Sequence, residues 1–310
     1  MKIGYPCLNL TIGCKADRTF RLKSFSEERL IETVSGNLDC LGEILRWNVA
    51  RQILFFRIIS DLVPFASHPV CQFDWQTHFH ASFARLGEFI RAHRLRISMH
   101  PDPFTLINSR EEAIFERSRR ELLYHAQVLD AMGLDRTARI QIHVGGVYGD
   151  RAGSIRRFIE RFARLDHAVR DRLVVENDEK SYSLRDCLTI HEETGLPVLL
   201  DTFHHSLLNH GEDLPACFER TGPTWRPECG LPMVDYSTQA AGKPRGVHTA
   251  GIELKDFRSL LTQSRPHDFD IMLEIKDKET SALKAVAAAR KDTRFTVFDN
   301  STGAPASSPI

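Results

Sequence analysis

Short apolar runs recur eight times along the chain, and each run passes into a polar residue at its end. In order, the runs are KIGYPCLNL, ILFFRIIS, RISMH, ARIQIHVG, RLVVEND, PVLLDTFHH, LPMVDYS and DIMLEIKD. A strand of a parallel sheet is buried on both faces, and it is therefore apolar over a short continuous stretch. The pattern predicts eight buried parallel strands.

Amphipathic segments with helix start and stop signals lie between these runs. The predicted helices span 26–47, 74–93, a segment from 109 to about 133, 153–170, 183–193 and 279–290. Ser109 followed by Glu112 predicts a capping box at the start of the third helix. We expect 210–230 to be a long loop with one short helix, and 239–247 to be another loop.

Strands that alternate with helices eight times favour a single α/β domain, a (β/α)8 TIM barrel, because right-handed β-α-β crossovers close at that number. The active site of such a barrel lies at the C-terminal ends of the strands. An open doubly wound sheet is the alternative, but no glycine-rich phosphate loop follows the first run. The barrel domain is expected over 1–299, and 300–310 has the composition of a disordered tail.

Composition narrows the class of protein. Hydrophobic residues make up 42% and charged residues 26% of the 310 residues, as in globular proteins. The charges of the 41 basic and 41 acidic residues cancel, so no overall positive field indicates a nucleic-acid partner.

The 7 cysteines form no C-x-x-C pair, so neither a disulfide framework nor a thiolate zinc site is expected, and a reducing cytoplasm fits best. No run could span a bilayer, and Asn9 and Gly13 interrupt the first run, which argues against a signal peptide.

Histidine and carboxylate side chains end most of the predicted strands. They are His100, His143, Glu176, Asp201, Asp235 and Glu274, and His204 follows Asp201 by three residues. A single histidine at a strand end is more often a hydrogen-bonded loop residue than a metal ligand. Four carboxylates that end buried runs nevertheless need cations among them, and metal ions supply these. The set predicts a metal centre at the barrel mouth, whereas His248 lies in a loop and does not follow from this pattern.

The ligand types indicate the chemistry of such a centre. Histidine and carboxylate ligands without cysteine suit Zn²⁺ or Mn²⁺. Two or three ions close together can activate water and neutralise the charge that develops on a phosphate ester. Hydrolysis of a phosphate ester is therefore the favoured reaction class.

These positions resemble the UV damage endonucleases, TIM barrels related in architecture to the apurinic-site endonuclease IV enzymes. The resemblance extends from the first run to about Ala289 and rests on Gly-Tyr-Pro-Cys-Leu-Asn, Phe-Arg-Ile-Ile-Ser-Asp-Leu-Val-Pro-Phe, Met-His-Pro-Asp, Ile-His-Val-Gly-Gly, Val-Glu-Asn-Asp-Glu, Leu-Asp-Thr-Phe-His-His, Met-Val-Asp-Tyr-Ser and Met-Leu-Glu-Ile-Lys-Asp-Lys-Glu. It implies a DNA repair endonuclease that hydrolyses the phosphodiester 5′ to a UV photoproduct in double-stranded DNA. Cyclobutane dimers and 6-4 photoproducts would be its substrates, and a 3′-hydroxyl and a 5′-phosphate would remain.

The resemblance also implies two or three divalent ions, with Mn²⁺ expected and Zn²⁺, Mg²⁺ or Co²⁺ as alternatives. His100, His143 and Glu176 would hold one ion, Glu176 would bridge to a second ion shared with Asp201, Asp235 and Glu274, and His204 and His248 would reach a third. Family members often carry histidine where this chain has Asp235, and an aspartate is still a ligand for a hard cation, which favours manganese.

The predicted catalytic residues are Glu176, Glu274 and Lys276. The lysine follows Glu274 by two residues, the period of one strand face, so it could neutralise the scissile phosphate or the leaving oxygen.

The resemblance further implies contacts to DNA or to the lesion from Tyr5, Asn9, Arg57, Ser60, Pro103 and Phe104. Relatives usually place glutamine, then tyrosine or phenylalanine, where this chain has Pro103 and Phe104. The proline has lost the amide, but the phenylalanine keeps an apolar wedge that can unstack bases. Lys243 and Arg245 could contact phosphates. The arginine-rich segments 117–120 and 151–164 are expected on outer helices, away from the mouth.

Two other functions stay open. Sugar isomerases and epimerases of the xylose-isomerase-like barrels also place His, Glu and Asp at strand ends, but they need only one or two metals, and the additional His204 and His248 favour the nuclease. A protein that binds damaged DNA without cutting it is the second alternative, because Pro103 alters the wedge. In either DNA-directed case we expect a monomer in the cytoplasm, associated with the nucleoid and not with a membrane.

Overall fold

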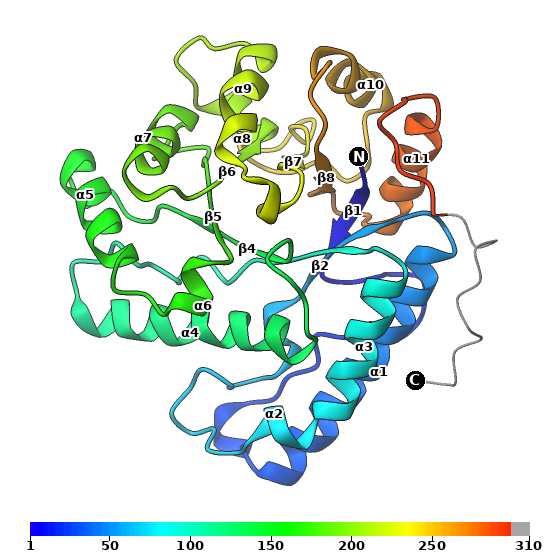
Figure 1. The fold of residues 1–310 in the computed structure, drawn as a ribbon, viewed down its shortest axis with the longest axis vertical. Coiled ribbons are helices and arrows are strands. Elements are labelled where there is room, and N and C mark those ends of the chain that lie inside the picture. Colours follow the sequence, from blue (N-terminus) through cyan, green and yellow to red (C-terminus); the bar gives the residue numbers. More distant parts are fainter. Residues whose placement is uncertain (299–310) are drawn as a thin grey trace.

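A computed structural model of the protein describes residues 1–298, and its strands close into a parallel barrel ringed by helices (Figure 1). The strands are β1 (Ile3–Pro6), β2 (Phe55–Ile58), β3 (Arg96–Met99), β4 (Arg139–His143), β5 (Leu173–Glu176), β6 (Val198–Asp201), β7 (Met233–Tyr236) and β8 (Asp270–Leu273). Each strand pairs with the next along the chain, and β8 pairs with β1. The predicted (β/α)8 barrel is confirmed. The tail predicted at 300–310 and the last residue of the predicted domain, 299, lie outside the described residues.

Helices connect the strands on the outside of the barrel. They are α1 (Glu27–Val49), α2 (Trp75–His78), α3 (His80–Ala92), α4 (Glu112–Ala131), α5 (Arg151–Phe162), α6 (His167–Arg170), α7 (Leu184–Thr194), α8 (Thr202–Leu207), α9 (Leu214–Thr221), α10 (Leu254–Gln263) and α11 (Glu279–Ala289), with short 3-10 turns η1 (Leu22–Ser24), η2 (Ser60–Leu62), η3 (Gly222–Thr224) and η4 (Pro227–Cys229). The short helix expected within 210–230 is α9.

Local capping explains why two predicted helices begin where the sequence places them. The Ser26 side chain accepts a hydrogen bond from the backbone N–H of Arg29 and caps α1. Ser183 and Asp186 form a reciprocal capping box at α7. This helix ends at Gly195, whose positive φ of 72° suits a glycine at the C-terminal cap.

The capping box predicted at the start of α4 is wrong. Ser109 accepts a hydrogen bond from the N–H of Glu111, 3.1 Å away, and Glu111 is the residue before the helix. The Glu112 carboxylate instead pairs with Arg161, at 3.2 Å, and with Arg164. Ion pairs to a neighbouring helix therefore replace the local cap.

Other boundaries also differ from the sequence prediction. The helix predicted at 74–93 breaks at Phe79 into α2 and α3, and the helix predicted at 153–170 divides into α5 and α6. The side chain of Asp150 caps α5, which therefore starts earlier than predicted. The sixth apolar run leaves the sheet at Asp201, which caps α8. The helix α10 was not predicted from the sequence.

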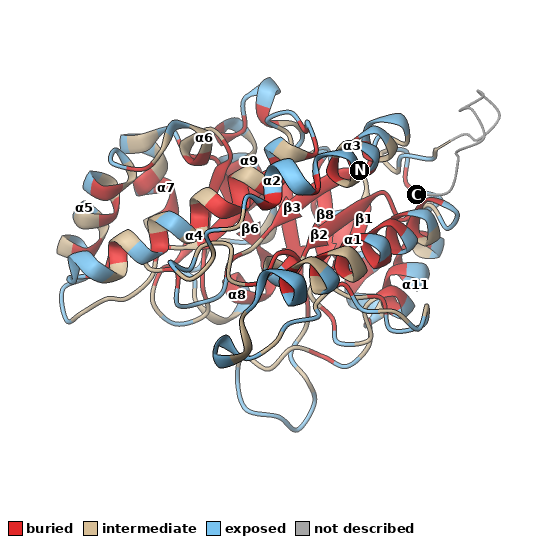
Figure 2. Cartoon of the chain, turned by 90° about the horizontal axis from the view of Figure 1, so that it is seen from below, coloured by how far each residue is buried: buried red, intermediate tan, exposed pale blue. Residues whose placement is uncertain are grey.

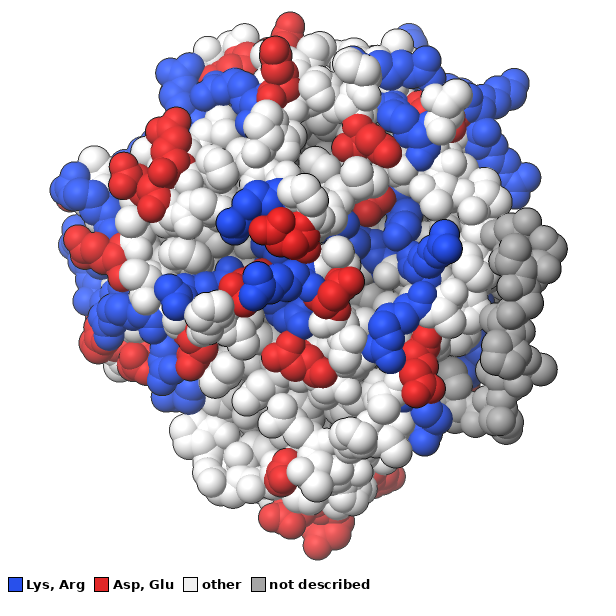
Figure 3. Space-filling view, in the orientation of Figure 1, with Lys and Arg blue, Asp and Glu red and all other residues white. Residues whose placement is uncertain are grey.

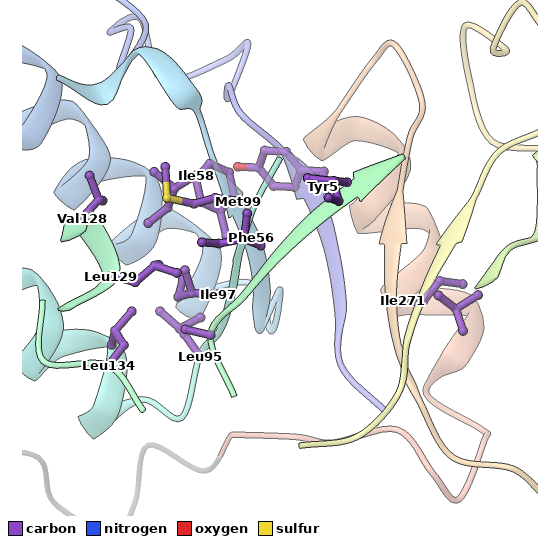
Figure 4. Packing of buried hydrophobic residues seen from close by; sticks show 14 of the residues in the cluster. Tyr5, Phe56, Ile58, Leu95, Ile97, Met99, Val128, Leu129, Leu134 and Ile271 are labelled. Carbon is purple, nitrogen blue, oxygen red and sulfur yellow. The ribbon is translucent and has the colours of Figure 1, made fainter. Parts of the chain in front are cut away.

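Two separate apolar cores stabilise the barrel. Figure 2 shows the strands buried in the middle of the molecule and the helices with their outward faces exposed. The larger core lies between strands and helices, where Ile97 and Met99 of β3 meet Val128 and Leu129 of α4 (Figure 4). The smaller core fills the barrel interior and consists of Phe55, Val174, Leu199, Trp225, Cys229, Met233 and Met272.

A disulfide joins Cys14, in the loop after β1, to Cys40 of α1. The bond corrects the expectation that the cysteines form no disulfide, which rested on the absence of a paired motif; the two cysteines stand 26 positions apart. Their Cα atoms lie 5.8 Å apart only because the loop packs against the helix, and this tertiary contact has no local sequence signal. Within residues 1–298, no helix is long and apolar enough to cross a bilayer.

The packing of α3 predicts that Gly87 cannot be replaced by a larger residue without a loss of stability. A Cβ added at Gly87 would lie 1.7 Å from the carbonyl oxygen of Met132, so one of the two backbones would have to move. We expect Gly87→Ala to lower the free energy of unfolding by roughly 1–3 kcal/mol. Calorimetric melting checks this against Gly222→Ala, because a Cβ at Gly222 meets nothing within 4 Å. Equal melting temperatures for the two variants would contradict the packing described here.

Candidate metal centre

The side chains that face the barrel interior form an apolar floor with an ionisable layer above it. On five strands an apolar residue of the inner core precedes an ionisable residue by two positions, the period of one strand face. The pairs are Phe55 and Arg57, Val174 and Glu176, Leu199 and Asp201, Met233 and Asp235, and Met272 and Glu274. The ionisable layer therefore lies one step nearer the C-terminal mouth than the floor.

Seven of the eight predicted metal ligands come together in three overlapping groups. The groups are His100, His143 and Glu176; Glu176, Asp201 and His204; and Asp201, Asp235 and Glu274, and in each group the candidate ligand atoms lie within 4.8 Å of one another. Because Glu176 and Asp201 each belong to two groups, the three groups form one continuous row across the mouth.

In the first group, two histidines face one carboxylate oxygen. Nε2 of His100 lies 3.6 Å and Nε2 of His143 lies 3.9 Å from Oε2 of Glu176. The register places His143 beside Glu176 on neighbouring strands. These separations are too long for hydrogen bonds. Metal–ligand bonds of roughly 2.0–2.2 Å put the ligand atoms of one ion about 3–4 Å apart, so the spacing suits a shared ion.

The second group centres on His204, which the first turn of α8 brings back over the mouth. Its Nδ1 lies 3.4 Å from Glu176 and 3.3 Å from Asp201. His248 approaches from the loop before α10, with Nδ1 2.8 Å from the backbone oxygen of Glu274 and 3.9 Å from its carboxylate. The ring of His248 lies 6.0 Å from that of His204, outside the three groups. Its assignment as a ligand stays a prediction.

Arg57 lies inside the barrel and not at a DNA groove, so that prediction does not fit the structure. It is 3% exposed, donates a hydrogen bond of 2.6 Å to Asp235 and pairs with Glu274. The physical reason is strand register: Arg57 points to the same face as Phe55 and must find carboxylates there.

Gln141 is a site residue that was not predicted from the sequence. Its Nε2 donates hydrogen bonds to Glu176, at 2.9 Å, and to Asp235, at 2.8 Å, so one amide joins carboxylates of two groups. The available signal was its position two residues before His143, on the inner face of the same strand. Because Gln141 lies within an apolar run and not at its end, the strand-end pattern does not select it.

Neighbouring side chains lower the pKa of two of the carboxyl groups. Burial alone would raise the pKa of Glu176, but the three histidines around it hold that pKa well below its usual value. Burial would also raise the pKa of Glu274, but Arg57 lowers it to about 2.

The other two carboxylates are harder to ionise. Burial raises the pKa of Asp201 to about 8 and that of Asp235 well above its usual range. Burial opposes the charge of His204 as well, but Asp201 and Glu176 outweigh it and raise its pKa to about 11. The hydrogen bond from Arg57 favours an ionised Asp235, whereas the neighbouring carboxylates favour its acid form. Arg57 and Gln141 both donate to Oδ2 of Asp235, so Oδ1 is the oxygen left for a proton or a cation.

Unpartnered polar atoms indicate what the site is built to hold. His100 Nδ1, His143 Nδ1, Asp201 Oδ2 and Asp235 Oδ1 are buried and make no hydrogen bond within the described residues. Buried polar atoms are ordinarily satisfied, so these four call for an ion, a proton or water. A set of nitrogen and oxygen donors without sulfur fits divalent cations such as Mn²⁺ or Zn²⁺. The residues present therefore fit the predicted metal cluster.

Tyr5 and Asn9, predicted to line a lesion pocket, are buried and bonded to each other. The Tyr5 hydroxyl donates to Asn48, at 2.7 Å, and accepts from Asn9, at 2.9 Å. Asn9 also accepts a hydrogen bond from the backbone N–H of Thr11, in the turn after β1. The side chains thus stabilise the first loop, and a direct role at the lesion stays a prediction.

The remaining residues that were predicted to contact DNA or a phosphate differ in how far they are exposed. Ser60 is half-buried and donates a hydrogen bond of 2.8 Å to the backbone oxygen of His100, which fixes the loop of that histidine. Lys276 is exposed in the turn after β8, since the strand ends at Leu273 and the period of two stops there. Lys243 is also exposed, and Arg245 donates to the backbone oxygen of Leu207.

The loop that carries Pro103 and Phe104 separates two hollows. On one side a hollow of about 310 Å³ is lined by His100 and His143, and on the other side a larger one of about 600 Å³ is lined by Phe104, Arg117 and Arg120. Phe104 is 72% exposed, as a wedge must be. Arg117 and Arg120 lie on the outer helix α4, as expected, and the hollow they line includes no residue of the three metal groups, so the expectation that they lie away from the mouth stays a prediction.

Because the protein has no net charge, any electrostatic contact with DNA would come from local groups of basic side chains. The formal net charge is zero, and basic and acidic side chains are interspersed on the face drawn in Figure 3. Individual basic side chains such as Arg117 and Arg120, which line the hollow beside Phe104 together with Asp102 and Glu121, are therefore the candidates for phosphate contacts.

Comparisons with known proteins show which family this chain matches. The family model for UV-endonuclease UvdE matches residues 1–297. A UV DNA damage endonuclease from Clostridium perfringens is 35% identical over 94% of this chain and 71% of its own length. Another, from Bacillus thuringiensis subsp. konkukian, is 32% identical over 92% of this chain and 93% of its own.

Solved structures agree as well. The crystal structure of SacUVDE superposes with a TM-score of 0.89 at 45% identity, over 93% of this chain and 98% of that one. Endonuclease IV from Thermus thermophilus superposes with a TM-score of 0.59 at 17% identity, over 81% of this chain and 93% of that one. A D-psicose 3-epimerase superposes with a TM-score of 0.54 at 13% identity, over 81% of this chain and 92% of that one. The last two show a shared fold and no more.

The raised pKa values of Asp201 and His204 predict how metal binding depends on pH. A ligand carboxyl group and a ligand imidazolium must both lose a proton to bind a cation, so Mn²⁺ binding should release protons, and affinity should rise as the pH increases through about 8, the pKa of Asp201, and beyond it. Titration calorimetry in two buffers of different ionisation enthalpy measures the protons released. The Asp201→Asn variant should release fewer protons when Mn²⁺ binds. An affinity independent of pH, with no proton release, would contradict the charge assignment.

Proposed function

This chain belongs to the UV-endonuclease UvdE family, and we propose that it is a metal-dependent DNA repair endonuclease that hydrolyses the phosphodiester 5′ to UV photoproducts. The substrate would be double-stranded DNA with cyclobutane dimers or 6-4 photoproducts, and a 3′-hydroxyl and a 5′-phosphate would be left. The single observation that carries the proposal is the row of three His and carboxylate groups at the mouth of a barrel that matches this family.

Each group of the row has a proposed role in holding cations, for which Mn²⁺ is the first candidate and two or three ions the expected number. His100, His143 and Glu176 would hold one ion, Asp201, Asp235 and Glu274 another, and His204 and His248 would reach a third. Such ions would stabilise charge on the phosphate and lower the pKa of an attacking water.

The protein's own side chains would orient these ligands. Arg57 holds Asp235 and Glu274, and Gln141 holds Glu176 and Asp235, so the carboxylates keep their positions before cations bind. Pre-organised ligands lower the cost of reorganisation during the reaction. Lys276 is placed to approach a phosphate only from the rim, since it is exposed in the turn after β8.

Lesion recognition would use the loop between the two hollows. Phe104 is positioned to insert into the base stack, where an exposed apolar side chain can unstack a base step and kink the duplex. A crosslinked dimer already stacks poorly, so distorting it costs less than distorting intact DNA. The hollow beside the metal groups would then receive the damaged strand, and Arg117 and Arg120 would contact phosphates across the loop.

The two alternative functions are less well supported. A sugar isomerase or epimerase shares the fold with this chain but at 13% identity, whereas the named endonucleases match nearly its whole length. A protein that binds without cutting would not need the row of ligands. Because all candidate ligands come from one chain, we propose that the enzyme acts as a monomer, on DNA at the nucleoid.

Nicking of supercoiled plasmid tests the proposed activity. With added Mn²⁺ the protein should nick UV-irradiated plasmid and leave unirradiated plasmid intact. Glu176→Gln should lose at least about a hundredfold in rate, because two groups share this carboxylate. A folded protein with Mn²⁺ bound that nicks neither plasmid would refute the activity. Equal nicking of both plasmids would refute the specificity for damage.

Arg117 and Arg120 beside Phe104 predict a salt-dependent contribution to DNA binding. Replacing Arg117 and Arg120 together by glutamine should weaken binding to irradiated and intact duplex alike, and the slope of log affinity against log salt should fall by about one for each phosphate that is no longer bound. Fluorescence anisotropy measures this, with Arg156→Gln on α5 as a control that lines neither hollow. The predicted phosphate binding would be disproved by a slope that the double variant leaves unchanged.

A further inference from the structure

A third cavity lies at the opposite end of the barrel from the metal groups. Arg139 lines it at the start of β4, and Asp171 and Pro197 line it just before β5 and β6 begin. Its volume of about 220 Å³ falls below the roughly 300–1,000 Å³ of pockets that take drug-sized ligands. The cavity therefore suits a small group, and the proposed nuclease chemistry uses none of its residues.

The charges around this cavity do not balance. Four arginines line it, against the two carboxylates of Asp171 and Glu228. Asp171 pairs with Arg136 at 2.7 Å, and Glu228 pairs with Arg226 at 3.4 Å. Arg139 and Arg170 are left, and neither forms an ion pair with a carboxylate within residues 1–298.

Arg139 is the more deeply placed of the two. It is 2% exposed, and its bonds of 2.9, 2.8 and 3.0 Å all go to neutral backbone oxygens, those of Arg136, Asp171 and Leu173. Burial and the neighbouring arginines lower its pKa to about 10, and it is still charged at neutral pH. The Nε–H groups of Arg139 and Arg170 are both buried without a hydrogen-bond partner among the described residues. A buried charge without a counter-charge is costly, so an anion in this cavity would stabilise the fold.

We propose that this cavity binds a phosphate group between Arg139 and Arg170, supplied either as free inorganic phosphate or by DNA. Guanidinium groups recognise phosphate through paired, charge-assisted hydrogen bonds, and both of these arginines line the cavity without a carboxylate partner among the described residues. The proposal goes beyond the nuclease activity and does not depend on it, since the metal groups lie at the other end of the barrel.

Calorimetric titration of inorganic phosphate into the metal-free protein tests the proposal. Chelation removes any metal ion that could hold phosphate at the mouth, the carboxylates of the mouth repel an anion, and sodium chloride at matched ionic strength is the reference. Phosphate should bind and raise the melting temperature where chloride does not. Arg170→Gln should weaken binding by roughly tenfold, the loss of one charge-assisted hydrogen bond. Arg170→Lys should restore part of it, and Arg258→Gln, on the exposed face of α10, should change nothing.

Two results would overturn the proposal: chloride acting as well as phosphate, or Arg170→Gln binding phosphate as tightly as the parent protein. Arg139 would then serve only to tie the backbone at the start of β5. Competition between a DNA duplex and inorganic phosphate identifies the source of the bound phosphate. A short duplex without terminal phosphates that displaces inorganic phosphate makes a DNA phosphate the ligand, and a duplex that fails to do so makes it the free anion. Because nicking is measured separately, failure of either proposal leaves the other standing.

Discussion

Four carboxylates, three of them buried and one half-buried, share one barrel mouth, and the neutralisation of their charge is the constraint on the structure around them. Glu176, Asp201, Asp235 and Glu274 lie within overlapping groups, and ionised carboxylates removed from water are unstable unless cations or protons neutralise them. The side chain of Arg57 balances part of this charge, protonated histidine and protonated carboxyl groups balance more, and divalent cations would balance the whole set once the protons leave. A surplus of negative charge at a fixed place is therefore what makes the mouth a metal site.

Strand geometry explains why the charges gather there. Each of five short strands contributes an apolar side chain to the floor and an ionisable one two residues later, so the floor excludes water beneath the carboxylates and the mouth stays open to a substrate. The opposite end of the barrel carries the opposite imbalance, with Arg139 and Arg170 lacking carboxylate partners within residues 1–298. The two ends thus favour ligands of opposite charge, metal cations at the mouth and an anion at the base.

Much of this could be predicted from the sequence, because strand-end residues follow from local periodicity. The eight strands and the clustering of His100, His143 and Glu176 required only that parallel strands end at one rim. Features that depend on tertiary contact were missed. Arg57 was placed at a DNA groove because a lone arginine gives no sign of the carboxylates across the barrel, and Gln141 was overlooked because it sits within an apolar run.

Anomalous diffraction from crystals grown with Mn²⁺ tests the central claim most directly, because it locates the cations independently of activity. If the mouth is a metal site, one manganese peak is expected at roughly 2.0–2.2 Å from the ligand atoms of His100, His143 and Glu176. A further peak is expected between Asp201, Asp235 and Glu274. Manganese that binds the protein elsewhere while both positions stay without anomalous signal would contradict the assignment of this mouth as a metal centre.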